Sequence, residues 1–358
     1  MKGSGIGGQA VMEGVMMKNG DRYAVAVRKP DKEIIVKTSE SPAFIKGRKV
    51  LSLPFIRGVF SFVDSLVLGM KTLTYSAGFF DDEEEEAEKE PSKLEKKIDS
   101  FLNTKKGMDI LLGITVAISM VLAVGIFMIL PYMASTLLKN IGASQNVIVV
   151  AEGILKIVIF LLYIKLISTM KDIQRVFMYH GAEHKCINCI EHGLELNVEN
   201  VMKSSREHKR CGTSFLLIVM IVSVIAHMFI RVDSKILGLV IRVLLLPVIA
   251  GISYEFIRLA GCSENKLVNL LSKPGMMLQR QTTREPSPDM VEVAIASVEA
   301  VFDWKKFLNE NFGTDYEIVE KEYVCGETIV PGTEKEHMTT NKADAENISG
   351  GAADGAVS

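Results

Sequence analysis

The sequence predicts a mainly α-helical membrane protein with four transmembrane helices and a small α+β cytoplasmic domain. The chain has 358 residues and a mean hydropathy of +0.24. Its apolar residues gather in four long runs, at 110–130, 147–167, 214–230 and 236–257. About 20 apolar residues can cross a hydrocarbon core of about 30 Å, so each run predicts a transmembrane helix.

Lysine and arginine predict the orientation, because they tend to remain on the cytoplasmic side of a membrane. Six lysines lie in 81–107 and seven lysines or arginines in 168–213, whereas Lys139 is the one basic residue in 131–146. We therefore expect both termini and the 168–213 loop in the cytoplasm. No apolar run after Met1 resembles a cleavable signal.

The cysteine content and the net charge limit which binding partners the protein is expected to have. All five cysteines fall on the predicted cytoplasmic side, where reducing conditions favour free thiols or metal ligands over disulfides. A net charge of −2, without a pattern of basic and aromatic residues, argues against nucleic acid. The lipid bilayer is the expected partner.

The N-terminal cytoplasmic segment, 1–49, predicts a β-hairpin. Residues 23–28 and 33–38 have strand composition and flank a turn. The glycine-rich stretch 3–20 before them is compatible with a close approach to other backbone or to a ligand and, equally, with a flexible lead-in.

Residues 50–80 predict an amphipathic, membrane-associated helix. Arg57, Asp64 and Lys71 are spaced seven residues apart and form a narrow polar stripe. Such a helix lies along the membrane surface or packs beside the spans, and a fifth span is the alternative. An acidic linker, 81–107, follows it.

The four-span membrane core, 108–257, contains Glu152, Lys156 and Arg242 at similar depth. Charges inside a membrane usually pair with one another or line a polar cavity. An ion pair between helices is the first interpretation of these residues, and a transport pathway is the second.

The C-terminal cytoplasmic segment, 258–329, starts as a polar connector. An amphipathic helix is predicted from Pro288 to about Glu310. The tail, 330–358, has little apolar content and is expected to be disordered. We expect the N-terminal, central-loop and C-terminal segments to fold together as one cytoplasmic domain.

The stretch Tyr179–Lys185 predicts a metal site. His180 and His184 are four residues apart, so both lie on one helix face with Glu183 beside them. This H-x-x-E-H pattern is the one in which two histidines hold zinc and the glutamate activates water. A divalent metal, with zinc as the first candidate, and a catalytic Glu183 follow from this interpretation. A solvated polar helix face is the alternative.

A site of this kind needs a third protein ligand. Glu255 is the first candidate, because it is expected at the inner end of the fourth span, although an interfacial glutamate explains it equally well. His208 and Cys211, just before the third span, are the other candidates. If the histidine helix runs on to Gly193, all three can approach it from outside.

A competing arrangement uses the C-x-x-C pair Cys186 and Cys189 with His208 and Cys211 as a structural zinc site. It requires the histidine helix to break before Cys186. In a continuous helix, at about 100° per residue, both cysteines of the pair point away from the histidines. Gly181 is a tolerable interruption, so the sequence favours the continuous helix.

Four blocks of sequence resemble the signature blocks of the YqhQ-like family, a bacterial membrane family of unknown function whose members are described as predicted metal-dependent enzymes. The blocks are Gly8–Met17, His180–Lys185, His208–Phe215 and Leu278–Pro286. The resemblance implies a multi-pass protein of the bacterial cell membrane. His180, Glu183, His184, His208 and Cys211 match these blocks, but the resemblance brings no substrate. Cys186 and Cys189 lie outside the blocks.

The functional prediction is a metal-dependent membrane hydrolase with a site that faces the cytoplasm and a peptide or a lipid-derived ester as substrate. The alternative is a non-catalytic membrane assembly or regulatory protein with a structural metal. Four protein ligands would favour the alternative, whereas three ligands beside Glu183 in an open cleft would favour the enzyme.

Overall fold

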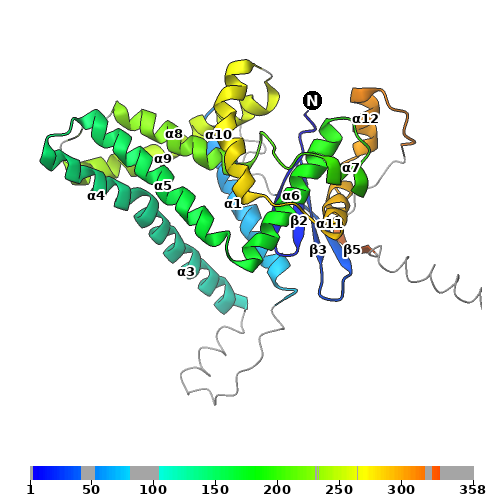
Figure 1. Cartoon of the computed structure of the whole chain (residues 1–358). Coiled ribbons are helices and arrows are strands. Elements are labelled where there is room, and N and C mark those ends of the chain that lie inside the picture. Colours follow the sequence, from blue (N-terminus) through cyan, green and yellow to red (C-terminus); the bar gives the residue numbers. More distant parts are fainter. Residues whose placement is uncertain are drawn as a thin grey trace, which may run out of the picture.

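A computed structural model describes residues 3–41, 53–80, 105–229, 232, 234–263, 265–318 and 325–330. Figure 1 shows the long apolar helices α3, α5, α8 and α9 together on the left and a small sheet with helices α6, α7, α11 and α12 on the right. Helices α1 and α10 lie between these two parts. The acidic linker, except its last three residues, and the predicted disordered tail, except its first residue Val330, which ends a strand, fall outside the described residues.

The sheet has five antiparallel strands in the order β1-β2-β3-β4-β5. Their bounds are Gly7–Val11, Gly14–Asn19, Arg22–Arg28, Ile34–Glu40 and Gly326–Val330. The hairpin β3–β4 confirms the predicted strands. The glycine-rich stretch before it is not a flexible lead-in, because it forms the hairpin β1–β2 around a Met12–Glu13 turn.

The sheet is covered on both faces. Helices α6 (Lys171–Glu191) and α11 (Pro288–Glu299) pack on one face, where Tyr179, Ile187 and Val291 are fully buried with the strand residues Val15 and Ala24. Helix α1 covers the other face. This second layer buries Leu68 with Val25 and Tyr23. Burial of apolar area on both faces is what stabilises so small a sheet.

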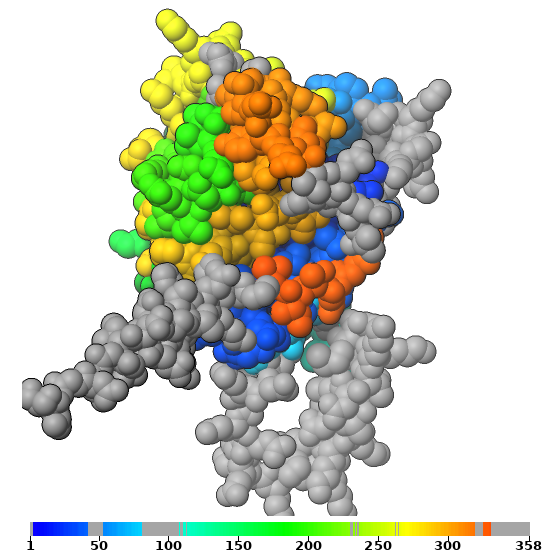
Figure 2. Space-filling view, turned by 90° about the vertical axis from the view of Figure 1, so that its right-hand side faces the viewer, coloured from blue at the N-terminus to red at the C-terminus, as the bar shows by residue number. Residues whose placement is uncertain are grey.

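Figure 2 looks onto the end of this domain, where α11 and α12 lie between the segment around residue 200 and the strands. The C-terminal strand β5 lies against the blue N-terminal strands, and its Ile329 pairs with Ile35 of β4. The N-terminal, central and C-terminal segments therefore form one folded unit, α6 and α11 included.

Helix α1 (Ile56–Ala77) confirms the predicted amphipathic helix. Its Gly58 packs against Tyr254 and Gly251 of helix α9, and its sheet-facing side includes Leu68. The large apolar residues Val63, Leu66 and Val67 are 41–52% exposed. An exposed apolar stripe next to the apolar helices is typical of a segment that contacts lipid.

Three helices of the described residues are long and apolar enough to cross a membrane: Gly113–Ile141, α5 (Gln145–Ile167) and Ile236–Gly261 within α9 (Lys235–Cys262). Helix α8 (Gly212–Met228) is apolar but has only 17 residues. The structure therefore bears out a membrane protein, and the four predicted spans are not confirmed.

The first span does not stop at Pro131, where the apolar run was expected to end. Helix α3 (Lys105–Val124) continues through a π-helical turn, η3 (Gly125–Ile129), into α4 (Leu130–Thr136) and a 3₁₀ turn, η4 (Leu137–Ile141). Proline lacks an N–H and clashes with the preceding turn. The wider π-helical turn accommodates it, so the helix continues.

The three membrane charges form one buried cluster. Nζ of Lys156 lies 2.7 Å from Oε1 of Glu152, and Nη2 of Arg242 lies 2.7 Å from its Oε2. The Tyr132 ring faces the Arg242 guanidinium at 4.2 Å. The cluster therefore links α5 to α9 as an ion pair between helices, the first of the two predicted roles.

The helices differ from the sequence prediction in three ways. The expected polar connector is a helix, α10 (Lys266–Thr282), and the central loop contains the short α7 (Val198–Lys203). The single helix predicted from Pro288 to about Glu310 is two, α11 and α12 (Trp304–Phe312). Asp303 separates them, because its side chain accepts a hydrogen bond from the Lys306 N–H and starts a new helix.

Candidate metal centre

Helix α6 carries His180, Glu183 and His184 on one face. The two imidazole ring centroids are 4.4 Å apart, and Oε2 of Glu183 lies 3.9 Å from Nε2 of His180. The helix runs without a break from Lys171 to Glu191, as predicted. Its continuity is what brings the motif's three side chains to one side.

Backbone carbonyls fix the orientation of both histidines. Nδ1 of His180 lies 2.8 Å from the Thr282 carbonyl oxygen, and Nδ1 of His184 lies 2.6 Å from that of Arg206. A carbonyl oxygen only accepts, so each Nδ1 carries the proton and donates it. Each Nε2 is then the nitrogen that can bind a metal, and a carbonyl partner of this kind is the usual support of a metal-binding histidine.

Cys211 joins the two histidines from the N-cap position of α8. Its Sγ lies 3.3 Å from Nε2 of His180. One possible ligand atom from each of the three residues lies within 4.8 Å of the other two. Two imidazoles and a thiolate suit zinc, and three protein ligands leave a fourth position for water, as in catalytic zinc sites. The residues present therefore fit a divalent metal.

Without a metal, a proton lies between Nε2 of His180 and Sγ of Cys211, and a bound ion would displace it. Burial alone would lower the pKa of His180, but the facing Cys211 thiolate raises it to about 9. Burial alone would likewise raise the pKa of the Cys211 thiol, but the charge of His180 and hydrogen bonds from both histidines lower it well below its usual value. The sulfur is thus held as the thiolate, the form that binds metals.

The Glu183 carboxylate lies beside the three candidate ligands. Its charged neighbour is His180 at 3.9 Å, and no group in the described part of the chain donates a hydrogen bond to it, although the residue is only 4% exposed. With His180, His184 and Cys211 it lines a cavity of about 730 Å³. Cavities of this size hold substrates or cofactors, so Glu183 is placed to exchange protons with a bound molecule.

Glu255, the first candidate for the third ligand, makes a different contact. Its Oε2 lies 2.5 Å from Nη2 of Arg57, and its Oε1 accepts a hydrogen bond from the Phe55 N–H. It is not among the converging ligand atoms. The ion pair with α1 holds its carboxylate at the surface of α9, so the structure favours Cys211 as the third ligand.

His208 and the C-x-x-C cysteines also lie outside the group of three. The His208 ring centroid is 5.8 Å from that of His184, but its Nε2 faces Oε2 of Glu191 at 3.4 Å. Cys186 and Cys189 are fully buried in the core between α6 and α11. Because α6 is continuous, the C-x-x-C…H-x-x-C arrangement does not form.

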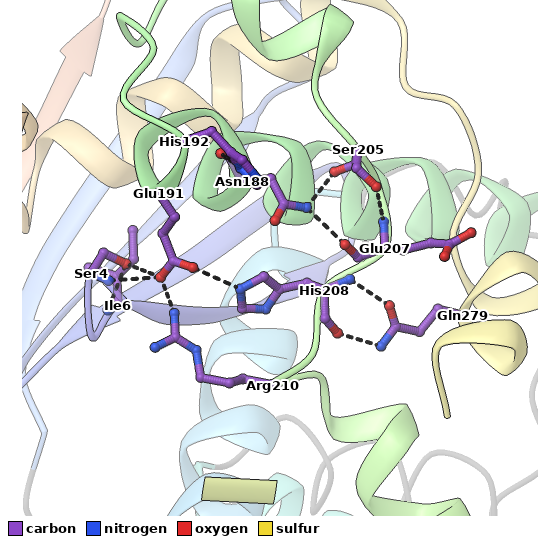
Figure 3. Close-up of polar contacts among 10 residues, drawn as sticks. All are labelled: Ser4, Ile6, Asn188, Glu191, His192, Ser205, Glu207, His208, Arg210 and Gln279. Atoms are coloured by element: carbon purple, nitrogen blue, oxygen red, sulfur yellow. Dashed lines mark hydrogen bonds and ion pairs between the residues drawn. The ribbon is translucent and has the colours of Figure 1, made fainter. Parts of the chain in front are cut away.

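A buried carboxylate, Glu191, connects the surroundings of the site (Figure 3). It accepts hydrogen bonds from the N–H and Oγ of Ser4, both at 2.8 Å, and pairs with Arg210 and His208. The Gln279 side chain binds the backbone of His208 from the other side. Its Oε1 accepts a hydrogen bond from the His208 N–H at 2.8 Å, and its Nε2 donates one to the His208 carbonyl oxygen at 2.7 Å. The chain just before Cys211 is therefore held by two helices, α6 through Glu191 and α10 through Gln279.

These supporting groups were not predicted. Glu191 had a signal, because it follows His184 by seven residues and so lies on the same helix face. The carbonyls of Thr282 and Arg206 had none, because backbone oxygen atoms carry no residue identity.

The comparisons with known proteins identify the family of the chain. The model of the family described as "Protein of unknown function (DUF1385)" matches residues 53–304. A Bacillus subtilis (strain 168) protein described as "Uncharacterized protein YqhQ" is 33% identical over 323 residues, which cover 87% of this chain and 97% of the relative. No solved structure matches. The chain therefore belongs to the DUF1385 family of YqhQ-like proteins, as its four sequence blocks predicted.

Proposed function

We propose that the protein is a metal-dependent hydrolase at the cytoplasmic surface of the bacterial cell membrane. His180, His184 and Cys211 would hold a divalent ion, zinc being favoured by the thiolate. A bound ion of this kind lowers the pKa of water and polarises a carbonyl. The single observation that carries the proposal is the convergence of the three ligand atoms beside the carboxylate of Glu183 in one cavity.

The protein's own residues would have separate roles in the reaction. The Thr282 and Arg206 carbonyls hold the imidazoles in the tautomer that leaves Nε2 free. Glu183 takes a proton from the attacking water and returns it to the leaving group. The buried position of the site, where His184 is 1% exposed, excludes bulk water and strengthens these electrostatic interactions.

Metal content tests this assignment directly. We expect about one metal per chain, measured by mass spectrometry on the detergent-purified protein. His184→Ala and Cys211→Ala should lose it, whereas Glu183→Gln should keep the metal and lose hydrolysis. Cys189→Ala is the matched control, because it removes a buried thiol outside the site. A wild-type protein that takes up no zinc would contradict the proposal.

The proposal includes the topology. Four spans, with α8 as the third, place both termini and the metal centre in the cytoplasm. Helix α8 would span about 25 Å at roughly 1.5 Å per residue, close to the thickness of the hydrocarbon core. The basic residues of 168–213 support the cytoplasmic position of that loop.

Cysteine labelling in intact cells checks the topology. A membrane-impermeant maleimide should label Lys139→Cys from outside. The exposed native Cys325 should react only after the cells are opened. Labelling of Cys325 in intact cells would place the C-terminal segment outside.

A further inference from the structure

Strand β1 is an edge of the sheet that no other described strand covers. In an antiparallel ladder, every second residue points its N–H and C=O away from the partner strand. The N–H of Met12 lies outside the ladder and donates to Oγ of Ser76 at 3.1 Å. Counting back in steps of two, Ala10 and Gly8 turn their backbone groups to the same outer side, and among the described residues no hydrogen bond occupies them.

The free edge of β1 faces the cavity of the metal centre. Residues Gly5–Ala10 line that cavity. Residues of α1 around Phe62 and of α6 around His184 line it on either side, because these two helices cover opposite faces of the sheet. An unpaired strand edge and the three converging ligands therefore share one space.

The glycines of β1 suit this place. Neither Gly7 nor Gly8 has a positive φ, so backbone conformation does not require glycine at these positions. A Cβ on Gly8 would clash with the Met16 carbonyl oxygen of β2 and would lie 2.8 Å from Sδ of Met17 and 3.1 Å from Cγ of Glu183. Close packing against β2 therefore requires glycine here, and it also lets the strand run next to Glu183. A Cβ on Gly7 would meet nothing within 4 Å. The strand thus leaves space beside its free edge.

The edge is held in position although it is unpaired. Ser4, three residues before β1, is bound to the buried carboxylate of Glu191. On the other side, Nε2 of Gln9 donates to Oγ1 of Thr72 on α1 at 2.9 Å. Exposed edge strands usually carry a charge, a proline or a bulge that prevents further pairing, and β1, with the sequence GGQAV, carries no charge or proline. Because β1 is held in place and its sequence has no charge or proline to prevent pairing, its edge is preorganised to pair with another strand.

We propose that the cavity binds an extended polypeptide segment, which pairs as an added strand with β1, and that this polypeptide is the substrate of the metal centre. The substrate assignment rests on the proposed hydrolase function. Backbone amides of the added strand would meet the outward groups of Gly8 and Ala10. The apolar part of the cavity, lined by Phe62, Phe215 and Ile257, would take an apolar side chain.

The polar edge favours a polypeptide over an acyl chain in this apolar cavity. An acyl chain has no donor or acceptor for the outward groups of β1, so its binding would bury them unpaired. Each unpaired group would weaken binding by roughly tenfold or more. A peptide satisfies the same groups with its own backbone.

The reaction is hydrolysis of one peptide bond. The water oxygen bonds to the carbonyl carbon, and the bond from that carbon to the amide nitrogen breaks. Glu183 accepts one proton from the water and passes it to the departing amine. The second proton of the water moves from the new carboxyl group to the same amine, so the fragments leave as a carboxylate and an ammonium. No oxidant or further reactant is needed.

Hydrogen exchange tests binding separately from activity. The probe is an acetylated and amidated peptide of alternating Leu and Ser, roughly eight residues long. It is added to the full chain in lipid nanodiscs, with metal removed by a chelator so that no cleavage occurs. We expect slower exchange at the amides of Gly8 and Ala10. Unchanged exchange in β1 at saturating peptide would overturn the proposal.

A pair of variants at Ala10 sharpens the test. Ala10→Pro removes the outward N–H, which an edge strand tolerates, and should weaken peptide binding roughly tenfold. Ala10→Ser keeps the N–H and should bind as the wild type does. Equal binding by both variants would overturn strand addition, and the exchange experiment on the wild type still decides the matter if Ala10→Pro does not fold.

Cleavage assays with zinc-loaded protein separate this inference from the proposed function. Cleavage of the peptide, with p-nitrophenyl palmitate left intact, supports both proposals. Cleavage of the palmitate ester alone overturns the polypeptide substrate and keeps the hydrolase. Protection of β1 without cleavage of either probe supports the binding site and contradicts the hydrolase.

Discussion

Two buried carboxylates, Glu191 on α6 and Glu152 on α5, meet cations in different surroundings. Both are at most 2% exposed. Glu152 joins two apolar helices through Lys156 and Arg242, and all its partners are side chains. Glu191 joins the N-terminal segment, α6 and the loop before α8, and one of its partners is the backbone N–H of Ser4.

The difference shows which cluster belongs to the site. The Glu152 cluster replaces water among helices whose outer surfaces are apolar, a typical arrangement within a membrane. The Glu191 cluster fixes the chain on both sides of the cavity, at Ser4 before β1 and at Arg210 before Cys211. We infer that the first cluster holds the helices together and that the second also positions metal ligands.

Removing each carboxylate should separate these roles. Glu191→Ala and Glu152→Ala each leave buried cations without a partner, which costs about 3–5 kcal/mol of unfolding free energy. Both variants should melt at lower temperature in detergent. Glu191→Ala should also bind zinc about 10–100-fold more weakly, as expected for loss of a supporting contact. Equal zinc affinity in the two variants would contradict a positioning role for Glu191.

Acid should weaken the Glu191 cluster in a defined range. Burial alone would raise the pKa of Glu191, but hydrogen bonding from His208 and the charge of Arg210 lower it from 4.5 to about 2. Because the folded-state pKa is depressed, the stabilisation is complete above pH 4.5 and is lost as the pH falls towards about 2. The difference corresponds to ~3 kcal/mol.

Thermal melting measured across this range should show the loss in the wild type. Glu191→Gln cannot titrate, so its melting temperature should depend less on pH. The same slope in both proteins would mean that other carboxyl groups cause the acid sensitivity.

The membrane cluster should be replaceable as a whole. Buried ion clusters exchanged together for apolar residues of similar size are often neutral or stabilising by about 1–4 kcal/mol. We expect the combined change Glu152→Leu, Lys156→Met and Arg242→Leu to keep or raise the melting temperature. Preserved zinc binding would confirm that the cluster is structural, whereas loss of zinc would link it to the site.

The Glu191 cluster, in contrast, cannot be exchanged for apolar residues without loss of stability. Apolar side chains at Glu191, His208 and Arg210 would still leave the Ser4 N–H without an acceptor. The matching triple change should therefore destabilise the protein, and a neutral result would remove the distinction between the two clusters.

Periodicity in the sequence predicted the elements that depend on local pattern. The apolar runs, the hairpin β3–β4, α1 and the continuous α6 all follow from residue spacing. Strands β1 and β2 were missed because glycine has low strand propensity, and only the pairing with β3 and the cover of α6 compensate for it. Helix α10 was missed because Pro274 and its polar residues suggest a connector, yet Gly275 fits against Ser214 of α8.

Residue spacing along the sequence predicted the part of the site that lies on one helix. His180, Glu183 and His184 lie on one turn, so their meeting needs only a helix. The third candidate ligand, Cys211, comes from another element, and the ranking of Glu255 above Cys211 depended on depth in the membrane alone. What decides against Glu255 is its partner Arg57, nearly two hundred residues away in sequence, and no local pattern shows that contact.

The Arg57–Glu255 pair is the exposed counterpart of the two buried clusters, and its removal should have the smallest effect. Their side chains are 26% and 21% exposed, so solvent screens the pair. Glu255→Gln should cost less than about 1 kcal/mol and leave the metal content unchanged. The measurement is metal content beside the melting temperature, with Cys211→Ala as the variant that should lose the ion. If Glu255→Gln loses metal and Cys211→Ala keeps it, the ligand set is His180, His184 and Glu255, and the ion pair with Arg57 must open when the metal binds.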